Sequence, residues 1–428
     1  MKTIVRKILH GLLGDYYLDI SLWWFFFRLT PVPPGDKPRL LVIDHVFDQD
    51  LEALQRANSK YSFIIINAFF LRNIATLTFP PSVESYRSYN GTEMAPIRRR
   101  WRSVMDRFVK RVHKKYSICA VIAPSDNFFY VRELISALHD RKIPYYVIDK
   151  EGTICPAYFE HFAKYIKDHC PLIADHILVW SDRQRDFWLK TGVVSDMITV
   201  TGQPRSDFWK QSDRWLTKKQ LGIPGLRTGH KLFLFFTYDP WAYTPDYMVE
   251  RGEMHWEELR HQTHDVLFNF ARQHSEIDVV IKAHPQQVDL HELQATIARS
   301  GTNNVYLATG SKISNHLIVN ADCIIGFQTT ALIEAMVTDK PIIYTFWGEA
   351  RDRWANDLIP FHKSRGLTVA SSQSELLQVL ESSLNPTPIL KEQREARHDF
   401  VNEYLSSIDG LAAKRTIDEL DRLIRRQI

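Results

Sequence analysis

Short apolar runs recur along the first half of the chain, and each ends in polar residues or a turn. They occupy residues 39–44, 62–67, 118–123, 145–149, 177–180 and 197–201. Runs without polar alternation are typical of strands that are buried on both faces of a parallel sheet. Residues 129–141, between two of these runs, carry apolar side chains at the spacing of a crossover helix. This half therefore predicts a doubly wound α/β domain.

The second half repeats this rhythm after a break at residues 221–225, where glycine and proline interrupt the pattern. Its apolar runs occupy residues 231–236, 278–282, 305–307, 323–325 and 341–344, with a long helical segment at 256–273. Two Rossmann-like doubly wound α/β domains with a closing C-terminal helical segment predict the GT-B plan, in which the domains face each other across a cleft. The expected divisions are 1–36, 37–225, 226–390 and 391–428.

Residues 1–36 form a basic and aromatic leader in front of the first strand. Lys2, Arg6 and Lys7 alternate with apolar residues, and residues 22–27 read LWWFFF. No run of about 18 apolar residues occurs, so no transmembrane helix is predicted. A signal peptide would need a longer apolar region and a small-residue cleavage site. Two interpretations stay open: a helix packed on the protein's own core, or an interfacial helix on anionic lipid.

Composition and charge narrow the class of protein. The 428 residues are enough for two or three domains, and 45% hydrophobic with 24% charged residues indicates a globular chain. A net charge of only +4 gives no global reason to expect nucleic acid. The four cysteines show neither a CxxC pair nor a Cys/His ligand spacing, which favours a reducing cytoplasm and predicts no metal site.

Two basic clusters, at residues 98–102 and 110–115, fall on one predicted helix and give it a positive face. A solvated face is one interpretation, and attraction to anionic lipid or to a charged glycan acceptor is the other. No aromatic platform or recognition motif accompanies these charges, so nucleic acid is not a predicted partner.

Candidate chemistry lies where strands end, because ligands of open α/β sheets collect beyond the carboxyl ends of the strands. After the fourth strand, Gly152 allows a sharp turn, and Glu151 is the candidate base for the proton of an acceptor hydroxyl. A solvated charged loop is the plain alternative. Asp126, after the preceding strand, is the competing base, and Asp44 and His45 after the first strand are a third option.

A second candidate closes a strand in the second half, where Lys282 and His284 are followed by Pro285. Lysine and histidine bond phosphate oxygens through charge-assisted hydrogen bonds, and the proline turns the chain outward. Such groups lower the barrier to transfer when a leaving phosphate gains charge. The alternative is a histidine at the core edge that is hydrogen-bonded to the backbone.

A third candidate follows the strand that ends near Gly326. Thr329 or Thr330 is the expected N-cap of a helix whose exposed amides favour an anion. Glu334, about one turn further on, is placed to bond ribose or base hydroxyls, or to complete a capping interaction. The sequence has no GxGxxG fingerprint, P-loop or nucleophile elbow, which disfavours dinucleotide, P-loop and serine-hydrolase chemistry.

Together these three sites resemble the motifs of bacterial sialyltransferases and capsule Kdo transferases, which carry an acidic-acidic-Gly motif, a His-Pro motif and a Ser/Thr pair in that order. The counterparts here are Lys150-Glu151-Gly152, His284-Pro285 and Thr329-Thr330. The resemblance implies that Glu151 is the base and that His284, Thr329 and Thr330 bind the CMP phosphate. Lys150 stands where those families usually have an acidic residue.

Other segments extend the resemblance to roughly residues 118–428. Residues 201–207, with Gly202 and Arg205 as loop support, resemble a linker motif of capsule and teichoic-acid transferases. Asp409-Gly410 is similar to the tail of CDP-glycerol glycerophosphotransferases, which also carry a Lys-x-His-Pro element. The chain thus resembles the capsule-type transferases of surface carbohydrate biosynthesis.

This resemblance implies an inverting, metal-independent glycosyltransferase that needs no cofactor beyond its nucleotide-sugar substrate. The favoured donor is a CMP-linked acidic sugar, and the expected acceptor is a surface polysaccharide or glycolipid. The expected location is the cytoplasm, with peripheral contact at the inner face of an anionic membrane. The alternatives are a CDP-glycerol-type glycerophosphotransferase, a non-hydrolysing sugar-nucleotide epimerase, and a non-catalytic membrane-peripheral scaffold with a degenerate nucleotide fold.

Overall fold

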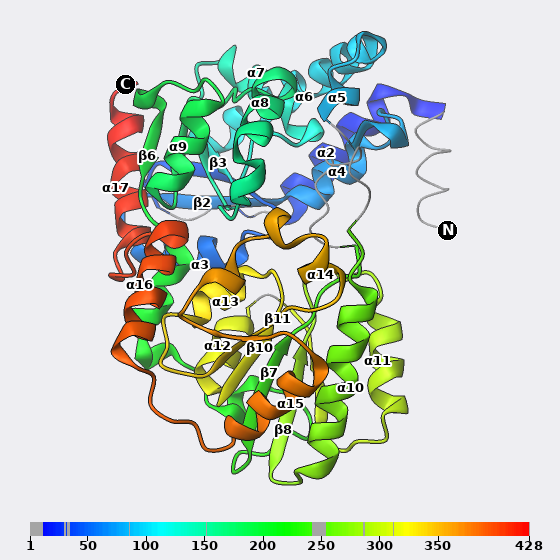
Figure 1. The fold of residues 1–428 in the computed structure, drawn as a ribbon. Coiled ribbons are helices and arrows are strands. Elements are labelled where there is room, and N and C mark those ends of the chain that lie inside the picture. Colours follow the sequence, from blue (N-terminus) through cyan, green and yellow to red (C-terminus); the bar gives the residue numbers. More distant parts are fainter. Residues whose placement is uncertain are drawn as a thin grey trace. The chain divides into compact units, whose positions relative to one another are not determined.

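The computed structural model contains two compact α/β units, each built around one six-stranded parallel sheet (Figure 1). The structure describes residues 12–29, 31, 35–84, 86–150, 152–241, 254–285, 287–310 and 312–427. The first unit comprises Met1–Gly152, Glu160–Arg205 and Leu411–Ile428, and the second comprises Thr153–Phe159 and Ser206–Gly410. The predicted α/β class with two doubly wound domains is confirmed.

The sheet of the first unit has the order β2-β1-β3-β4-β5-β6, with all neighbours parallel. Its strands are β1 (Arg39–Asp44), β2 (Ser62–Asn67), β3 (Ile118–Ala123), β4 (Tyr145–Ile148), β5 (His176–Val179) and β6 (Ile198–Val200). Its helices are α2 (Asp15–Leu29), α3 (Asp48–Ala57), α4 (Ala68–Ala75), α5 (Tyr86–Tyr89), α6 (Ala95–Tyr116), α7 (Phe129–His139), α8 (Phe159–His169), α9 (Asp182–Lys190) and α17 (Ala412–Arg425). The first three strands begin and end where the apolar runs predict. Every residue of β4 and β5 and nearly all of β3 is buried, which explains why these strands show no polar alternation.

The sheet of the second unit has the order β12-β11-β10-β7-β8-β9, again with all neighbours parallel. Its strands are β7 (Lys231–Phe236), β8 (Ile277–Lys282), β9 (Val305–Ala308), β10 (Cys323–Gly326), β11 (Ile342–Thr345) and β12 (Thr368–Ala370). Its helices are α10 (Glu257–Gln273), α11 (Leu290–Arg299), α12 (Ser314–Asn320), α13 (Thr330–Ala335), α14 (Glu349–Asp352), α15 (Gln373–Ser382) and α16 (Lys391–Leu405). The strand that comes first in the chain lies in the middle of the sheet, as in doubly wound folds.

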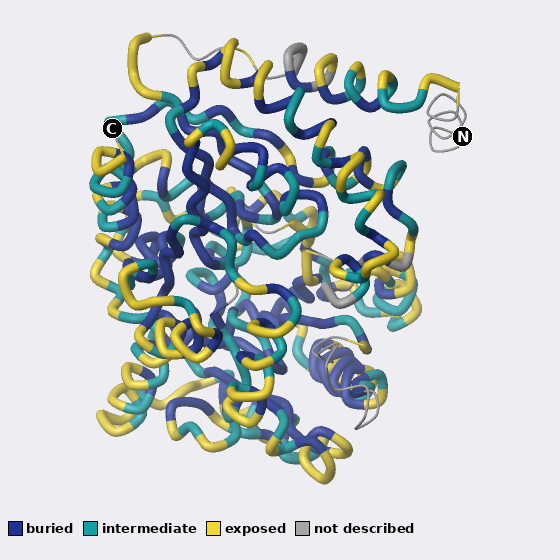
Figure 2. The backbone as a smooth tube through the Cα atoms, turned by 90° about the horizontal axis from the view of Figure 1, so that it is seen from above, coloured by how far each residue is buried: buried dark blue, intermediate teal, exposed yellow. Residues whose placement is uncertain are grey.

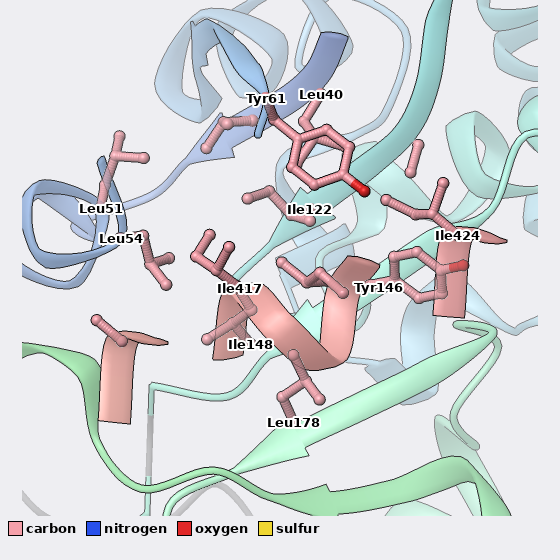
Figure 3. Close-up of a cluster of buried hydrophobic side chains, with 14 of the residues drawn as sticks. Leu40, Leu51, Leu54, Tyr61, Ile122, Tyr146, Ile148, Leu178, Ile417 and Ile424 are labelled. Atoms are coloured by element: carbon pink, nitrogen blue, oxygen red, sulfur yellow. The ribbon is translucent and has the colours of Figure 1, made fainter. Parts of the chain in front are cut away.

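The C-terminal helical segment is divided between the two units. α16 lies in the second unit, whereas α17 lies in the first. Between them the chain turns through Ser406 at φ 69° and Gly410 at φ 81°, both in the left-handed region. The apolar face of α17 completes the core of the first unit, where Ile417 and Ile424 pack among residues of β1, α3 and β3 (Figure 3).

The junction expected at residues 221–225 lies inside the second unit, because the change of unit comes after Arg205. Aromatic packing explains why residues 206–225 belong to the second unit. The Phe208 ring meets the Trp215 ring at 6.3 Å and the His316 ring at 4.9 Å between centroids, which ties this segment to α12. The glycines and prolines at 221–225 therefore mark a turn within a unit.

The predicted leader contains α2, and part of that helix is packed on the core. Leu18, Leu22 and Phe26 are buried, one helical turn apart. Buried and exposed colours alternate along the helical segment next to the N-terminal end of the tube (Figure 2). Lys2, Arg6 and Lys7 lie outside the described residues. None of the helices in the described part of the chain combines the length and the apolar character that a membrane span requires.

Candidate functional site

The sheet of the second unit has a topological switch point at β7. This strand pairs with β8 on one side and with β10 on the other, and all three run in the same direction. Connections that leave in opposite directions open a crevice beyond the carboxyl ends of the central strands, where α/β proteins bind ligands. The segments that begin there are 237–241 after β7, 283–285 after β8 and 327–329 after β10. Lys282, His284 and the Thr329-Thr330 pair therefore belong to one edge of one sheet, as predicted.

Lys282 is the last residue of β8, and its ammonium group is buried. Its Nζ donates a hydrogen bond of 2.5 Å to the carbonyl of Ala283, and no carboxylate of the described ranges pairs with it. Burial lowers the pKa of Lys282 to about 8. A buried ammonium bonded to a neutral carbonyl gains stability from an incoming anion, because a charge in a low-dielectric site needs a partner.

The next residues turn the chain away from the sheet. The carbonyl of His284 accepts a hydrogen bond of 3.0 Å from the backbone N–H of Gln287. His284 and Pro285 are both exposed. The β8 end thus presents a buried cation and an exposed imidazole two residues apart.

The loop after β10 is held in a strained conformation by a residue that the sequence analysis missed. Gln328 has φ 42°, in the left-handed region that favours glycine, and such a conformation costs about 1–3 kcal/mol. Its side-chain amide donates to the Tyr344 hydroxyl at 2.8 Å and to the carbonyl of Ile359 at 3.0 Å. It also accepts from the Ile359 backbone N–H at 2.9 Å. Three hydrogen bonds hold this loop, and no sequence signal marks a glutamine for that role.

Thr329 follows directly and caps α13, where its side chain accepts from the Ala331 N–H at 3.3 Å. The predicted N-cap is therefore confirmed for Thr329. Gly326 leaves little room, because a Cβ there would lie 3.2 Å from a methyl carbon of Leu332. Glu334 lies in α13 and is buried, and its proposed bond to ribose or base hydroxyls stays a prediction.

Aromatic rings form the layer beneath this loop. The Phe327 ring lies 5.1–5.7 Å, between ring centroids, from those of Tyr238, Trp256 and Tyr344. Arg260, buried in α10, donates from Nη1 to the carbonyl of Tyr238 at 3.2 Å and holds the segment after β7 in place. These residues were not predicted, because their positions on helices and loops converge only in the fold.

The corresponding edge of the first unit carries the loop after β4. Glu151 lies outside the described residues, and its neighbours define the anchorage of the loop. Asp149 accepts from Trp188 Nε1 at 3.1 Å, and Lys150 Nζ donates to the Val46 carbonyl after β1 at 3.4 Å. A Cβ on Gly152 would lie 2.4 Å from Trp180 Cε3, so only glycine fits this close approach.

The two other predicted support residues meet neighbouring parts of the same unit. Arg205 donates to Asp50 Oδ2 at 3.0 Å, and its guanidinium lies 4.9 Å from the centre of the Trp180 ring. Gly202 has φ 85°, and a Cβ there would lie 3.0 Å from the Cβ of Ala412 in α17. The structure thus brings Gly152 and Arg205 together on Trp180, while Gly202 contacts the C-terminal helix.

Asp126, the competing base, is buried after β3. Its Oδ2 accepts backbone N–H groups of Ile173 at 2.6 Å and Ala174 at 3.2 Å, and burial raises the pKa of this carboxyl group. These contacts favour a role in holding the loop before β5, and a role as base stays a prediction.

His45, part of the third option, lies at the carboxyl end of β1 and is buried. Burial and the nearby cations of Lys150 and Arg72 lower its pKa to about 4, so its imidazole is neutral at neutral pH. Its Nδ1 lies 3.3 Å from the Tyr130 hydroxyl. The structure therefore places His45 beside Lys150, next to the loop of the favoured base.

A family model decides the class of the protein. The model for CDP-glycerol:poly(glycerophosphate) glycerophosphotransferase matches residues 164–420, more than half of the chain. The chain belongs to this glycerophosphotransferase family. The match runs from α8 to α17 and includes the Lys282–Pro285 and Gly326–Glu334 segments, whereas Glu151 and Asp126 precede it. The glycerophosphotransferase-family chain is accordingly a nucleotide-using transferase.

Solved structures agree on the fold of this glycerophosphotransferase-family protein. S. aureus MnaA with UDP superposes with a TM-score of 0.54 at 11% identity, covering 91% of this chain and 97% of that one. UDP-GlcNAc 2-epimerase from Neisseria meningitidis, bound to UDP-GlcNAc, gives 0.53 at 13% identity, covering 90% and 100%. The same enzyme from Methanocaldococcus jannaschii gives 0.53 at 13%, covering 90% and 100%. At these identities the likeness establishes the GT-B-type fold. No curated protein matches the sequence.

Proposed function

We propose that the protein transfers a group from a cytidine nucleotide to a hydroxyl of a surface polysaccharide or glycolipid and releases CMP. The first candidate donor is CDP-glycerol. The family match supports this donor, and the observation that carries the proposal is the buried Lys282 at the switch point of the second sheet. A cation with no carboxylate partner in the described ranges suits the phosphate of a nucleotide.

In the first candidate reaction, the acceptor oxygen attacks the phosphorus of the glycerophosphate group. The bond from that phosphorus to the oxygen bridging it to CMP breaks, and CMP keeps the electron pair. Lys282 and His284 are proposed to neutralise the charge that develops on the departing phosphate, and Thr329 and Thr330 to donate hydrogen bonds to it. Charge stabilisation and positioning supply most of the catalysis in phosphoryl transfer.

The second candidate is inverting glycosyl transfer from a CMP-linked acidic sugar. The order of the three motifs supports it, since a carboxylate at Glu151 suits the deprotonation of an acceptor hydroxyl. Here the acceptor oxygen attacks the anomeric carbon from the face opposite CMP, and CMP leaves with the electron pair. Both candidates therefore release the same nucleotide from the same phosphate site.

We propose that Glu151 takes the acceptor proton in either reaction. The anchorage of its loop supports this role, because Lys150 bonds to the backbone after β1 and Gly152 is packed against Trp180. Among the described residues, His45 is the alternative base, because its imidazole is neutral and lies beside Lys150. Asp126 is already bound to backbone N–H groups.

A panel of donors tests the proposal. The full-length protein is incubated with CDP-glycerol, a CMP-linked acidic sugar or UDP-GlcNAc, together with a polymeric acceptor, and released nucleotide is measured. CMP from CDP-glycerol supports the first candidate, and CMP from the acidic sugar supports the second. Isomerised UDP-GlcNAc without acceptor indicates an epimerase. Binding of CMP without turnover of any donor indicates a scaffold and overturns the proposal.

Metal dependence is a separate test. We propose that protein groups alone neutralise the leaving phosphate and that no metal ion or further cofactor takes part. Within the described ranges no group of three or more His, Cys, Asp or Glu side chains is arranged to hold a metal ion. EDTA should leave CMP release unchanged. If EDTA abolished CMP release and added Mg²⁺ restored it, this part of the proposal would be contradicted.

A further inference from the structure

The sheet of the first unit has its own topological switch point, at β1. This strand pairs with β2 on one side and with β3 on the other, and all three run parallel. The chain leaves β1 toward one edge of the sheet and leaves β3 toward the other, and α/β proteins bind ligands beyond the carboxyl ends of such strands. Each of the three strands is followed by an aromatic ring: His45 after β1, Phe69 after β2 and Phe128 after β3.

These rings form one cluster at the edge of the sheet. The His45 ring contacts both phenylalanines, with centroid distances of 5.0 Å to Phe69 and 4.4 Å to Phe128. The Phe128 ring is stacked on that of Tyr130 at 5.3 Å, and the Tyr130 hydroxyl lies 3.3 Å from His45 Nδ1. His45 and Tyr130 are buried, whereas Phe69 is 40% exposed. The cluster therefore combines a buried polar ring with an exposed apolar one.

The ring of Phe69 is placed by a helix that is packed through other residues. Phe69 lies in the first turn of α4, and its backbone N–H donates to the Asn67 side chain at 2.8 Å, which caps the helix. Leu71 and Ile74, on the other side of α4, are buried in the unit. The exposed ring of Phe69 is therefore held in place without contributing most of its surface to the core.

Two cations accompany the cluster. Burial lowers the pKa of His45 to about 4, and the next largest causes are the charges of Lys150 and Arg72, so both cations lie near this ring. Arg72 follows Phe69 by three residues, which places the two on the same side of α4. Val46, directly after His45, has φ 51°, a left-handed conformation that β-branched residues rarely adopt, and its carbonyl accepts from Lys150 Nζ at 3.4 Å. The end of β1 thus presents aromatic surface together with positive charge.

We propose that this cluster binds the acceptor through a pyranose ring that carries an acidic group. The C–H groups of a sugar face suit the negative face of the Phe69 ring, and the acidic group suits the cations of Arg72 and Lys150. Lys150 immediately precedes Glu151, so a sugar held here has its hydroxyls beside the loop of the proposed base. The inference rests on the proposed transfer reaction and names its acceptor as an acidic polysaccharide.

Titration calorimetry of the full chain with three probes tests the site. Trigalacturonate has acidic pyranose rings, maltotriose has neutral ones, and a trimer of glycerol phosphate has charge without a ring. Trigalacturonate should bind most tightly of the three. Phe69→Ala should weaken the binding of both sugars by about threefold to tenfold, because the stacked contact is lost, and should not affect the glycerol phosphate trimer. Arg72→Gln should weaken the binding of the two acidic probes alone, by about twofold to fivefold.

Two further variants separate stacking from a general effect on the fold. Phe69→Trp keeps an aromatic face and should bind both sugars like the unmodified protein. Leu189→Ala is the matched control, because Leu189 in α9 of the same unit is 37% exposed, and it should bind all three probes normally. Melting temperatures and the affinity for CMP should be equal in all variants. In the CMP release assay, Phe69→Ala should raise the KM for the polymeric acceptor and leave the KM for the donor unchanged.

The possible results distinguish this inference from the proposed reaction. Equal affinity of Phe69→Ala and Leu189→Ala for trigalacturonate would overturn the acceptor site, and CMP release by the unmodified protein would leave the reaction standing. Tighter binding of the glycerol phosphate trimer than of either sugar would also contradict the inference, because it would assign this edge to an acceptor without a ring. Binding of trigalacturonate that depends on Phe69, without turnover of any donor, would support the site and contradict the reaction.

Discussion

Gly152 has no room for a side chain beside the loop of the proposed base. A Cβ there would approach Trp180 Cε3 to 2.4 Å and Gln184 Nε2 to 2.5 Å. Trp180 is itself held by Arg205, whose guanidinium pairs with Asp50. The residue next to Glu151 is therefore positioned by a packed chain of contacts within the first unit.

Gly152→Ala should destabilise the protein by about 1–3 kcal/mol, because the added methyl group overpacks a filled site. It should also reduce CMP release by displacing the loop. Denaturant unfolding and a donor assay measure the two effects. Gly229→Ala is the matched control, because no atom of the described residues lies within 4 Å of where its Cβ would be. Equal free energies of unfolding for the two variants would contradict this prediction, because they would show that Trp180 leaves space for a methyl group at position 152.

The proposed base itself is tested by Glu151→Gln. The amide keeps the size of the side chain but cannot take a proton, so CMP release should fall by about 10²–10⁴-fold. The affinity for CMP, measured by titration calorimetry, should stay unchanged because the phosphate site lies in the second sheet. An active Glu151→Gln protein would move the base to another group, with His45→Gln as the next variant.

Lys282 predicts a pH-dependent nucleotide site. With a pKa of about 8, its ammonium is charged at pH 7 and mostly neutral at pH 9. CMP binding should therefore weaken by about tenfold from pH 7 to pH 9, since the charged form binds phosphate. Titration calorimetry of the unmodified protein and of Lys282→Met measures the affinity for CMP at both pH values. The variant should bind CMP weakly, and its affinity should not change between pH 7 and pH 9.

Lys340→Met is the control for that experiment. Burial also lowers the pKa of Lys340, which lies just before β11. Its Nζ donates hydrogen bonds to the carbonyls of Val319 and Ala321 at the end of α12. The variant should keep both the affinity for CMP and its pH dependence. Loss of CMP affinity in this variant would mean that buried charge in general, rather than the end of β8, controls binding.

At the scale of elements, α17 is the last helix of the chain and part of the first core. Its buried residues Ile417, Leu420 and Ile424 recur at helical spacing and belong to one core cluster. Figure 3 shows Ile417 and Ile424 in this cluster with Leu54 of α3 and Leu178 of β5. On its polar side, Asp421 accepts from the Tyr61 hydroxyl at 2.9 Å. The core of the first unit therefore includes a helix that follows the second unit along the chain.

Leu420→Ala should lower the free energy of unfolding by about 2–5 kcal/mol, because the residue is fully buried and leaves a cavity. Hydrogen exchange should show the loss mainly in the sheet of the first unit. Leu411→Ala is the control, since that side chain is 51% exposed and should change stability by less than about 0.5 kcal/mol. A shift of equal size in both sheets would contradict the assignment of α17 to the first core.

At the scale of the whole molecule, each unit contains a buried neutral histidine. Burial lowers the pKa of His45 to about 4 in the first unit and that of His264 to about 3 in the second. Below the ordinary value of 6.5 the unfolded chain takes up these protons and the folded chain does not. Each of these two histidines therefore lowers the free energy of unfolding as the pH falls from 6.5 toward 4, by at most about 1.4 kcal/mol per pH unit.

Histidine NMR resonances followed from pH 8 to pH 5 should leave His45 and His264 unchanged. His139 is the internal reference, because its hydrogen bond with Asp175 raises its pKa and its resonance should titrate above 6.5. Titration of His45 or His264 within this range would mean that solvent reaches that histidine in solution.

Much of the architecture could be predicted, and the reason is visible in single strands. Residues 39–44 and 118–123 are apolar without alternation because helices cover both faces of their sheet, and that pattern indicates a parallel strand by itself. At Asp126 the sequence shows only a carboxylate after a strand. The backbone N–H groups of Ile173 and Ala174, which donate hydrogen bonds to it, come from a loop about 47 residues away that only the fold brings next to it. Gln328 and Arg260 left no local signal.

The sequence by itself determined the two parallel sheets, the edge on which Lys282 and Thr329 lie, and the helical character of the chain end, because each follows from local periodicity and from the direction of strands. The tertiary structure alone decided that α17 belongs with the first sheet, that Gly152 meets Trp180, and that Leu18, Leu22 and Phe26 are the face of α2 that is buried in the first unit. Periodicity indicates that a face is apolar, but what covers that face depends on residues far away in the chain.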